Sequence, residues 1–282
     1  MPRGRKFYFK ALAVLFLACC LGLAVWSVLI EPNRIVVNVT TVRLPNSPSA
    51  FNQTRVVVLS DLHVGSPHIN IKKLQSIVAQ ANELKPDLIL LPGDFVVGHE
   101  LGANFVEPEL IADALKNLRA RHGVYAVLGN HDRWYDGNHV QRALENAGIR
   151  VLENEATPIR LDDQTVWLVG LGDLWTGSPN IEGALRNVPA QASIIAITHN
   201  PDLFTRIPAR VGLTIAGHTH GGQVDLPFVG RLVVPSEYGQ RYAAGLVREN
   251  DHLLFVTTGI GTSVLPVRFR VPPEIALLII TS

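Results

Sequence analysis

The chain has 282 residues, 47% of them hydrophobic, which is enough for one large domain with a buried core. Its formal net charge of +1 gives no general attraction to nucleic acid, so no nucleic-acid partner is specifically implied. The only two cysteines are the adjacent Cys19 and Cys20, which excludes an intrachain disulfide framework and a thiolate metal site.

The N-terminus has the pattern of a membrane anchor. Residues 1–10 contain four basic residues and no acid, and residues 11–30 contain no charge at all. An uncharged run of about 20 residues matches the length that an α-helix needs to cross a bilayer. A cleaved signal peptide has a shorter apolar region and a small-residue cleavage site, and the stretch "SVLIEPN" offers no convincing site. We therefore expect an uncleaved transmembrane anchor over residues 11–30.

The charges that flank this segment predict its orientation. The basic residues 1–10 precede it, whereas Glu31 and Arg34 follow it, which places residues 1–10 in the cytoplasm. Trp26 near the far end suits the membrane interface. The sequence thus predicts a single-pass protein of the cytoplasmic membrane whose globular body is extracytoplasmic.

Residues 31–50 mix β-branched residues with Pro, Asn and Ser, and we expect a tether with one edge strand over 35–43. From residue 51 to 282 we expect one domain in which strands alternate with helices. Strands are predicted for "RVVVLS", "PDLILLPGD", "GVYAVLGN", "TVWLVGLG", "ASIIAITH" and "VGLTIAGH". Helices are predicted for "NIKKLQSIVAQANEL", "EPELIADALKNLRAR", "NHVQRALENAG" and "IEGALRNV". The last forty residues add the strands "HLLFVTTGI" and "EIALLIITS", and the alternation predicts an α/β fold with a largely parallel arrangement.

Polar residues of metal-binding type follow five of these strands. In chain order they are Asp61 and His63; Asp94; Asn130, His131 and Asp132; His199; and His218 and His220. In open α/β sheets the site lies at the carboxyl ends of the strands, so these clusters are expected to converge. An isolated Asp after a strand is usually a turn or cap residue, and a lone His is usually structural. Five coincident strand ends with the same class of side chain point instead to a site.

The side-chain types in these five clusters limit which metal ions could bind there. Oxygen and imidazole ligands without thiolate suit divalent Mn, Fe or Zn. Two Asp, one Asn and four His exceed the needs of one ion, and they divide between two divalent metal ions bridged by one carboxylate. Two ions about 3.5–4 Å apart clamp an oxygen-rich substrate and hold a hydroxide between them, which predicts hydrolysis.

The motifs "DLH", "GD", "GNHD", "THNPD" and "GHTHGGQ" stand in this order between residues 55 and 224. Together they resemble those of the calcineurin-like metallophosphoesterase family. The tail "TGIGTSVLPVRFRVPPEIALLII" and the N-terminal anchor are similar to a membrane-anchored bacterial branch of phosphodiesterases. The resemblance implies a four-layer αββα sandwich over residues 51–282 and, with the anchor, a location in the bacterial inner membrane.

The resemblance also implies a role for each side chain. The first metal would be held by Asp61, His63 and His220, the second by Asn130, His199 and His218, and Asp94 would bridge the two. His131 would stabilise charge on the phosphoryl oxygens or protonate the leaving group, and Asp132 would orient the His131 ring. The implied reaction is in-line attack of a metal-bridging hydroxide on phosphorus.

The implied substrate is a phosphodiester or a pyrophosphate. Anchored relatives suggest a lipid-linked one such as UDP-2,3-diacylglucosamine of the lipid A pathway, although that compound is made on the cytoplasmic side, in conflict with the predicted orientation. The apolar segment 225–234 would be a hairpin in preference to an acyl-chain lip, and Asp173 and Trp175 could line the cleft. The rival hypothesis is a membrane-tethered, non-catalytic binding or scaffold protein. The complete set of ligands and His131 favours the hydrolase.

Overall fold

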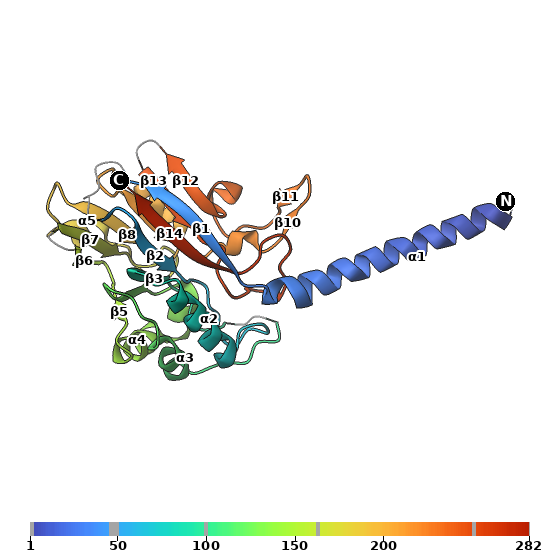
Figure 1. The fold of residues 1–282 in the computed structure, drawn as a ribbon, viewed down its shortest axis with the longest axis horizontal. Helices are drawn as coiled ribbons and strands as arrows, with labels where there is room; N and C mark the ends of the chain where they lie inside the picture. The colour runs from blue at the N-terminus through green and yellow to red at the C-terminus, as the bar shows by residue number, and fades with distance from the viewer. Residues whose placement is uncertain (1–2, 45–50, 99–100, 162–163, 250–251, 282) are drawn as a thin grey trace.

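The computed structural model describes residues 3–44, 51–98, 101–161, 164–249 and 252–281. Part of the predicted tether (45–50) and the first two residues of the basic N-terminus lie outside the described residues. The body is built from two mixed β-sheets that face each other, with helices on both outer faces, and a long helix leaves it at one end (Figure 1).

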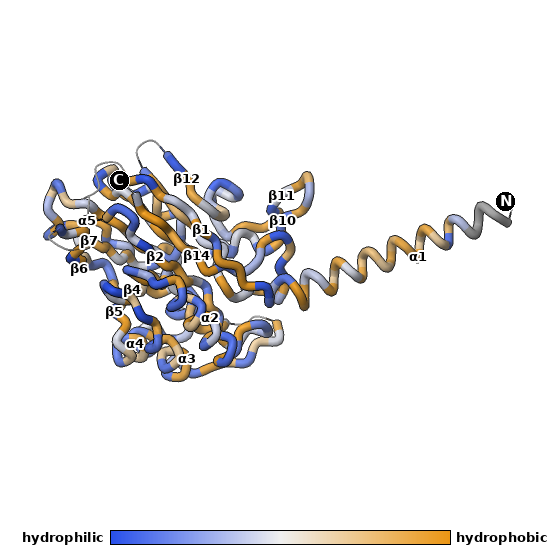
Figure 2. Tube along the Cα trace, viewed as in Figure 1, coloured by the Kyte–Doolittle hydropathy of each residue, from blue (hydrophilic) through white to orange (hydrophobic). Residues whose placement is uncertain are grey.

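The long helix begins with α1 (Arg3–Val25) and continues through η1 (Trp26–Ile30), a π-helical turn, and η2 (Glu31–Asn33). Residues Tyr8–Asn33 are long and apolar enough to cross a membrane, and none of the most apolar part is buried against the protein. Figure 2 shows this helix as a hydrophobic rod that stands clear of the body. The predicted anchor over 11–30 lies entirely within this segment.

The first sheet has six strands in the order β1-β14-β2-β3-β4-β5. Their bounds are β1 (Val36–Arg43), β14 (Glu274–Thr281), β2 (Thr54–Val58), β3 (Leu88–Pro92), β4 (Val124–Val127) and β5 (Arg150–Val151). β2 to β5 are parallel, β14 is antiparallel to β2, and β1 pairs in parallel with β14 at the sheet edge. The edge strand expected over 35–43 is therefore confirmed.

The second sheet has the order β12-β13-β9-β8-β7-β6. Its strands are β12 (Gly245–Glu249), β13 (His252–Val256), β9 (Leu213–Ala216), β8 (Ser193–Ile197), β7 (Gln164–Gly170) and β6 (Glu155–Leu161). The four inner strands are parallel, and the two edge strands β6 and β12 are antiparallel. Sequence reasoning missed β5, β6 and β12, because β5 has two residues and the edge strands alternate polar with apolar residues.

Helices form the outer layers. On the first sheet lie α2 (Ile71–Glu83), α3 (Pro108–Leu115) and α4 (Asn130–Asn146), and on the second lie α5 (Ile181–Leu185) and η4 (Pro201–Arg206). Separate apolar clusters fill the helix–sheet and sheet–sheet spaces. The predicted αββα sandwich is thus confirmed. Several helix boundaries differ: α3 ends at Leu115 instead of 121, α4 begins at Asn130 instead of Asn138, and α5 ends at Leu185 instead of 188.

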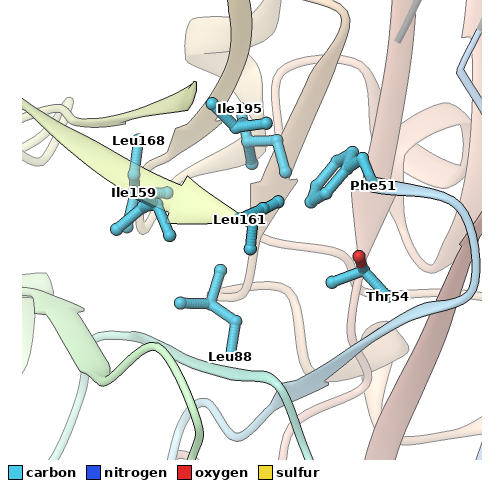
Figure 3. Close-up of a pocket in the computed structure, with 8 residues that line it drawn as sticks. Phe51, Thr54, Leu88, Ile159, Leu161, Leu168 and Ile195 are labelled. Carbon is cyan, nitrogen blue, oxygen red and sulfur yellow. The ribbon is translucent and has the colours of Figure 1, made fainter. Parts of the chain in front are cut away.

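After β9 the chain forms η5 (His220–Gly222), the hairpin of β10 (Asp225–Leu226) and β11 (Gly230–Arg231), and η6 (Gly239–Tyr242). The hairpin expected over 225–234 is therefore confirmed. Between the sheets lies a cavity of about 10 Å³, lined by apolar side chains such as Phe51, Leu161 and Ile195 (Figure 3). This volume is at the lower limit for one water molecule, so the two sheets are closely packed.

Candidate metal centre

The predicted ligands converge where the two sheets meet. Asp61 and His63 follow β2, Asp94 follows β3, and Asn130 begins α4 directly after β4. His199 follows β8, and His218 and His220 follow β9. All seven side chains are buried, although they come from five strands of two different sheets. The convergence expected from the strand ends is therefore present.

The first group contains Asp61, His63 and His220, whose potential ligand atoms all lie within 4.8 Å of one another. Nε2 of His63 lies 3.2 Å from Nε2 of His220, and Nε2 of His220 lies 3.4 Å from Oδ1 of Asp61. The backbone N–H of His218 donates to both oxygens of Asp61, at 3.0 and 3.1 Å, which fixes that carboxylate.

The second group contains Asp94, His199 and His218, also within 4.8 Å of one another. Nε2 of His199 lies 3.1 Å from Nδ1 of His218 and 3.1 Å from Oδ1 of Asn130. Asp94 lies between the two groups, because its Oδ2 is 3.2 Å from Nε2 of His199 and 3.5 Å from Nε2 of His63. One carboxylate oxygen is thus close to both groups.

These side chains suit divalent cations. Two pairs of buried imidazole nitrogens lie at contact distance, one between His63 and His220 and one between His199 and His218. At most one proton fits between the nitrogens of each pair, so at least one nitrogen of each pair is unprotonated and presents a lone pair. Among the described residues, Nε2 of His218 is buried without a hydrogen-bond partner. Buried polar atoms normally have partners, so this nitrogen is available to a group that the protein itself does not supply. The other nitrogen of the ring, Nδ1, is the one that faces His199 in the second group.

The backbone at the ligands is unusual. Five of the seven have positive φ: Asp61 (54°), His63 (40°), Asp94 (57°), His218 (71°) and His220 (51°). Non-glycine residues seldom adopt this region, and such strain gathers at functional sites. The strand ends therefore turn sharply to bring side chains from two sheets into one place.

Close approach also requires glycine at two motif positions. A Cβ on Gly129 would lie 2.2 Å from Oδ1 of Asp94, and one on Gly217 would lie 2.5 Å from Oδ2 of Asp61. Any side chain at either position would displace a carboxylate of the cluster.

His131 lies next to the cluster on the first turn of α4. Its backbone N–H donates to Oδ1 of Asp94 at 2.9 Å, and its ring forms a third group with His63 and Asp94. The ring packs edge-on against His63, with centroids 4.7 Å apart. This position, beside the groups without belonging to either of the first two, is compatible with the predicted proton-transfer role.

Asp132 contacts the backbone. Its two oxygens accept four N–H bonds, from Asp94, Phe95, Val96 and Gly129, at 2.8 to 3.2 Å. We expected Asp132 to orient the His131 ring, but these bonds instead hold the loop that carries Asp94 and cap the start of α4. This cap explains why α4 begins at Asn130. The helix is interrupted at Asp136, whose φ and ψ are not helical, and the predicted part of the helix follows this break.

Burial and charge set the protonation of the cluster. Burial alone would raise the pKa of Asp94, but His199, His131 and His63 lower it well below the usual value. Burial also opposes the charged form of His199, yet Asp94 raises the pKa of His199 well above its usual value. Burial lowers the pKa of His218 and His220, which keeps both imidazoles neutral and able to donate a lone pair.

Sequence reasoning missed Arg268, which is fully buried beside the first group. Its guanidinium donates to the carbonyls of Gly261 at 2.6 and 3.1 Å and of Thr258 at 2.9 Å. The backbone N–H of Gly261 in turn donates to the carbonyl of Asp61 at 2.6 Å. Arg268 thus organises the loop against which Asp61 packs. A single arginine in the C-terminal tail belongs to no motif, so the sequence did not indicate this role.

Two half-exposed tryptophans lie against site histidines. Trp175 packs edge-on against His218, with centroids 4.3 Å apart, and Trp134 lies 5.0 Å from His131. Asp173 is buried, and its Oδ2 accepts the backbone N–H of Trp175. Asp173 thus positions the loop that carries Trp175 beside His218. That Asp173 and Trp175 line a substrate cleft stays a prediction.

Comparisons with known proteins agree with this geometry. The model of the family described as calcineurin-like phosphoesterase matches residues 54–222. The chain is 31% identical over 256 residues to the uncharacterized metallophosphoesterase YkuE of Bacillus subtilis, covering 90% of this chain and 88% of that protein. It is 35% identical over 229 residues to the phosphodiesterase YaeI of Escherichia coli, covering 79% and 81%. A transmembrane protein with metallophosphoesterase domain from Danio rerio is 29% identical over 267 residues, covering 89% and 58%.

Proposed function

The chain belongs to the calcineurin-like phosphoesterase family, and we propose that it is a membrane-anchored, dinuclear hydrolase of phosphodiester or pyrophosphate bonds. The observation that carries the dinuclear proposal is the position of Asp94, whose Oδ2 faces His63 of one group and His199 of the other. A single ion would not require a carboxylate between two sets of ligands.

In this proposal Asp61, His63 and His220 would hold one ion, Asn130, His199 and His218 would hold the other, and Asp94 would be shared between them. Two such ions, when bound, neutralise phosphoryl oxygens and lower the pKa of water to about 7. Mn, Fe or Zn would suit these oxygen and nitrogen ligands. His131, at the side of the cluster, donates a proton to the leaving oxygen or stabilises charge on the phosphoryl group.

The substrate that we propose is lipid-linked, because the anchor would hold the metal centre near a membrane surface. UDP-2,3-diacylglucosamine is the specific compound to test. The basic residues 1–10 favour a cytoplasmic N-terminus and an extracytoplasmic body in the bacterial inner membrane. UDP-2,3-diacylglucosamine is made on the cytoplasmic side, so its turnover in the cell would require a cytoplasmic body. The side of the membrane on which the body lies therefore decides which lipid-linked substrates it can reach.

The test uses the full chain in detergent micelles, stripped of metal and supplied with Mn, Fe(II) or Zn. Bis-p-nitrophenyl phosphate, p-nitrophenyl phosphate and UDP-2,3-diacylglucosamine are the substrates. We expect metal-dependent turnover that Asp94→Asn and His131→Ala abolish and that His139→Ala, at a surface ion pair with Glu109, leaves intact. Metal-independent turnover, or turnover that survives both site substitutions, would overturn the proposal.

A further inference from the structure

Two loops near the point where α1 joins the body carry large apolar side chains into solvent. The β10–β11 hairpin and the two residues that follow it contribute Phe228, Val229, Leu232 and Val233, and the loop before Arg268 contributes Val264 and Leu265. We call these six residues the apolar rim. Phe228 is fully exposed and Val264 is 72% exposed. Clusters of exposed apolar residues of this kind mark surfaces that bind another partner.

The backbone at two of these exposed residues, Phe228 and Val264, is strained. Phe228 has φ of 66° and Val264 has φ of 64°, in the left-handed region. Bulky and β-branched residues are outliers there, and glycine or asparagine would fit without strain. Neither side chain is buried in the protein, so the strain is not offset by packing within the described fold. An external apolar environment would supply the missing stabilisation.

Hydrogen bonds tie the apolar rim to the end of the anchor. The N–H of Asp225, at the base of the hairpin, donates to the carbonyl of Phe269 at 2.9 Å. The N–H of the preceding residue, Arg268, donates to the carbonyl of Ser27 in η1, also at 2.9 Å. The hairpin therefore projects from the end of the body at which α1 leaves it (Figure 1), and its tip is as hydrophobic as α1 (Figure 2).

The apolar rim also adjoins the metal centre. Gln223, three residues after His220, donates through Nε2 to the carbonyls of Ser263 at 3.0 Å and Leu265 at 3.3 Å. Nε of Arg231, in strand β11 of the hairpin, donates to the carbonyl of Gly221 at 2.7 Å. The segment that carries His220 is thus bonded to both loops of the rim.

Basic residues accompany these apolar side chains. Nζ of Lys73 donates to the carbonyl of Asn33 at the end of the anchor, at 3.1 Å. Arg34 follows in the chain, and Arg270 follows Phe269; both are exposed. Basic side chains at this level of a membrane protein would lie among lipid phosphates and be attracted to an anionic surface.

We infer that a lipid bilayer covers the apolar rim, so that Phe228 and Val264 insert beside α1 and the metal centre works against the membrane surface. This inference rests on the proposed anchoring by α1. The exposed helix over Tyr8–Asn33 is long and apolar enough to cross a bilayer, and backbone hydrogen bonds join the rim to the end of that helix. The substrate would then be a phosphoester at a lipid headgroup, taken from the membrane without passing through bulk water.

The test measures depth in the bilayer. The full chain, with Cys19→Ser and Cys20→Ser, receives a single cysteine as Phe228→Cys, Val264→Cys or Leu110→Cys and is labelled with the fluorophore NBD. Leu110 is a matched control, since it is apolar and 56% exposed but lies on α3. Each protein is reconstituted in vesicles of phosphatidylcholine and phosphatidylglycerol, with and without doxyl-labelled lipids.

We expect blue-shifted emission and doxyl quenching at positions 228 and 264, with neither at position 110. Equal quenching at all three positions, or none, would overturn the inference. A blue shift without lipid quenching would assign the rim to a protein partner or a second copy of the chain, and would also overturn it. The readout needs no turnover, so a hydrolase that fails its assay and a rim that stays in water are distinguished.

Discussion

The carboxylate of Asp132 accepts a hydrogen bond from the backbone N–H of Asp94, with 2.9 Å between Oδ2 and N. Oδ1 of Asp132 holds the next two amides of the same loop. A residue that is not itself among the predicted metal ligands thus sets the position of the proposed bridging ligand.

Replacing Asp132 by Asn should weaken metal binding. The amide NH2 of Asn cannot accept the N–H groups that Asp132 now accepts, so one side of the network breaks and the loop of Asp94 loosens. Loss of such supporting partners costs about 10–100-fold in metal affinity or activity. Titration of the metal-stripped protein with Mn measures this. Asp113→Asn, at an exposed pair with Lys116, is the control, and equal affinities in the two variants would refute the role.

Arg268→Lys should destabilise the fold and weaken the first group. Lysine keeps the charge but cannot reach the carbonyls of Gly261, Thr258 and Val271 together. Each buried carbonyl left without a donor costs about 1–3 kcal/mol. Thermal unfolding of the full chain in detergent should show a lower Tm for Arg268→Lys than for Arg270→Lys, its exposed neighbour. The same Tm in both variants would contradict the account.

Trp175→Ala should reduce kcat/KM for a small phosphodiester. Removing the indole loses its T-shaped contact with the His218 ring, which is worth about 0.5–1.5 kcal/mol. It also admits water to the cluster. The expected decrease is roughly threefold to tenfold. Trp175→Phe keeps an aromatic edge and should recover most of the rate. A Phe variant as impaired as the Ala variant would argue that the ring contact is irrelevant.

Gly217→Ala should remove metal from the first group. The added Cβ would lie 2.1 Å from Oγ of Ser60 and 2.5 Å from Oδ2 of Asp61, so the carboxylate must move. Gly212→Ala, on the same segment just before β9, meets nothing closer than 3.8 Å and serves as the control. Metal content by elemental analysis should fall in the first variant only. Full metal content in Gly217→Ala would show that Asp61 tolerates displacement.

Sequence order explains which parts of the site were predictable. Asp61 and Asp94 follow buried runs in neighbouring parallel strands, so the strand topology alone brings them together. His199 follows a similar run, but its strand belongs to the second sheet, so the packing of the two sheets is needed to place it beside them. The alternation of strands and helices predicted the α/β class and the parallel strands, whereas the four αββα layers were implied by the family resemblance. Arg268 could not be found in this way, because its partners lie at residues 258–261, at residue 271 and at Ser27 in η1.

The role of Asp132 was also hidden from sequence reasoning. Its neighbour in the motif is His131, yet its bonds go to the loop after β3, nearly forty residues earlier in the chain. The edge strands β6 and β12 were missed for another reason. Edge strands carry polar residues on the face toward solvent, which weakens the hydrophobic signal that marks buried strands.

The central claim is that Asp94 bridges two metal ions, and electron paramagnetic resonance of the Mn-loaded full chain tests it most directly. The account predicts two equivalents of Mn per chain and a spectrum of spin-coupled ions, with the coupling lost in Asp94→Asn. One equivalent of Mn, or two ions whose uncoupled spectrum is unchanged by Asp94→Asn, would contradict it.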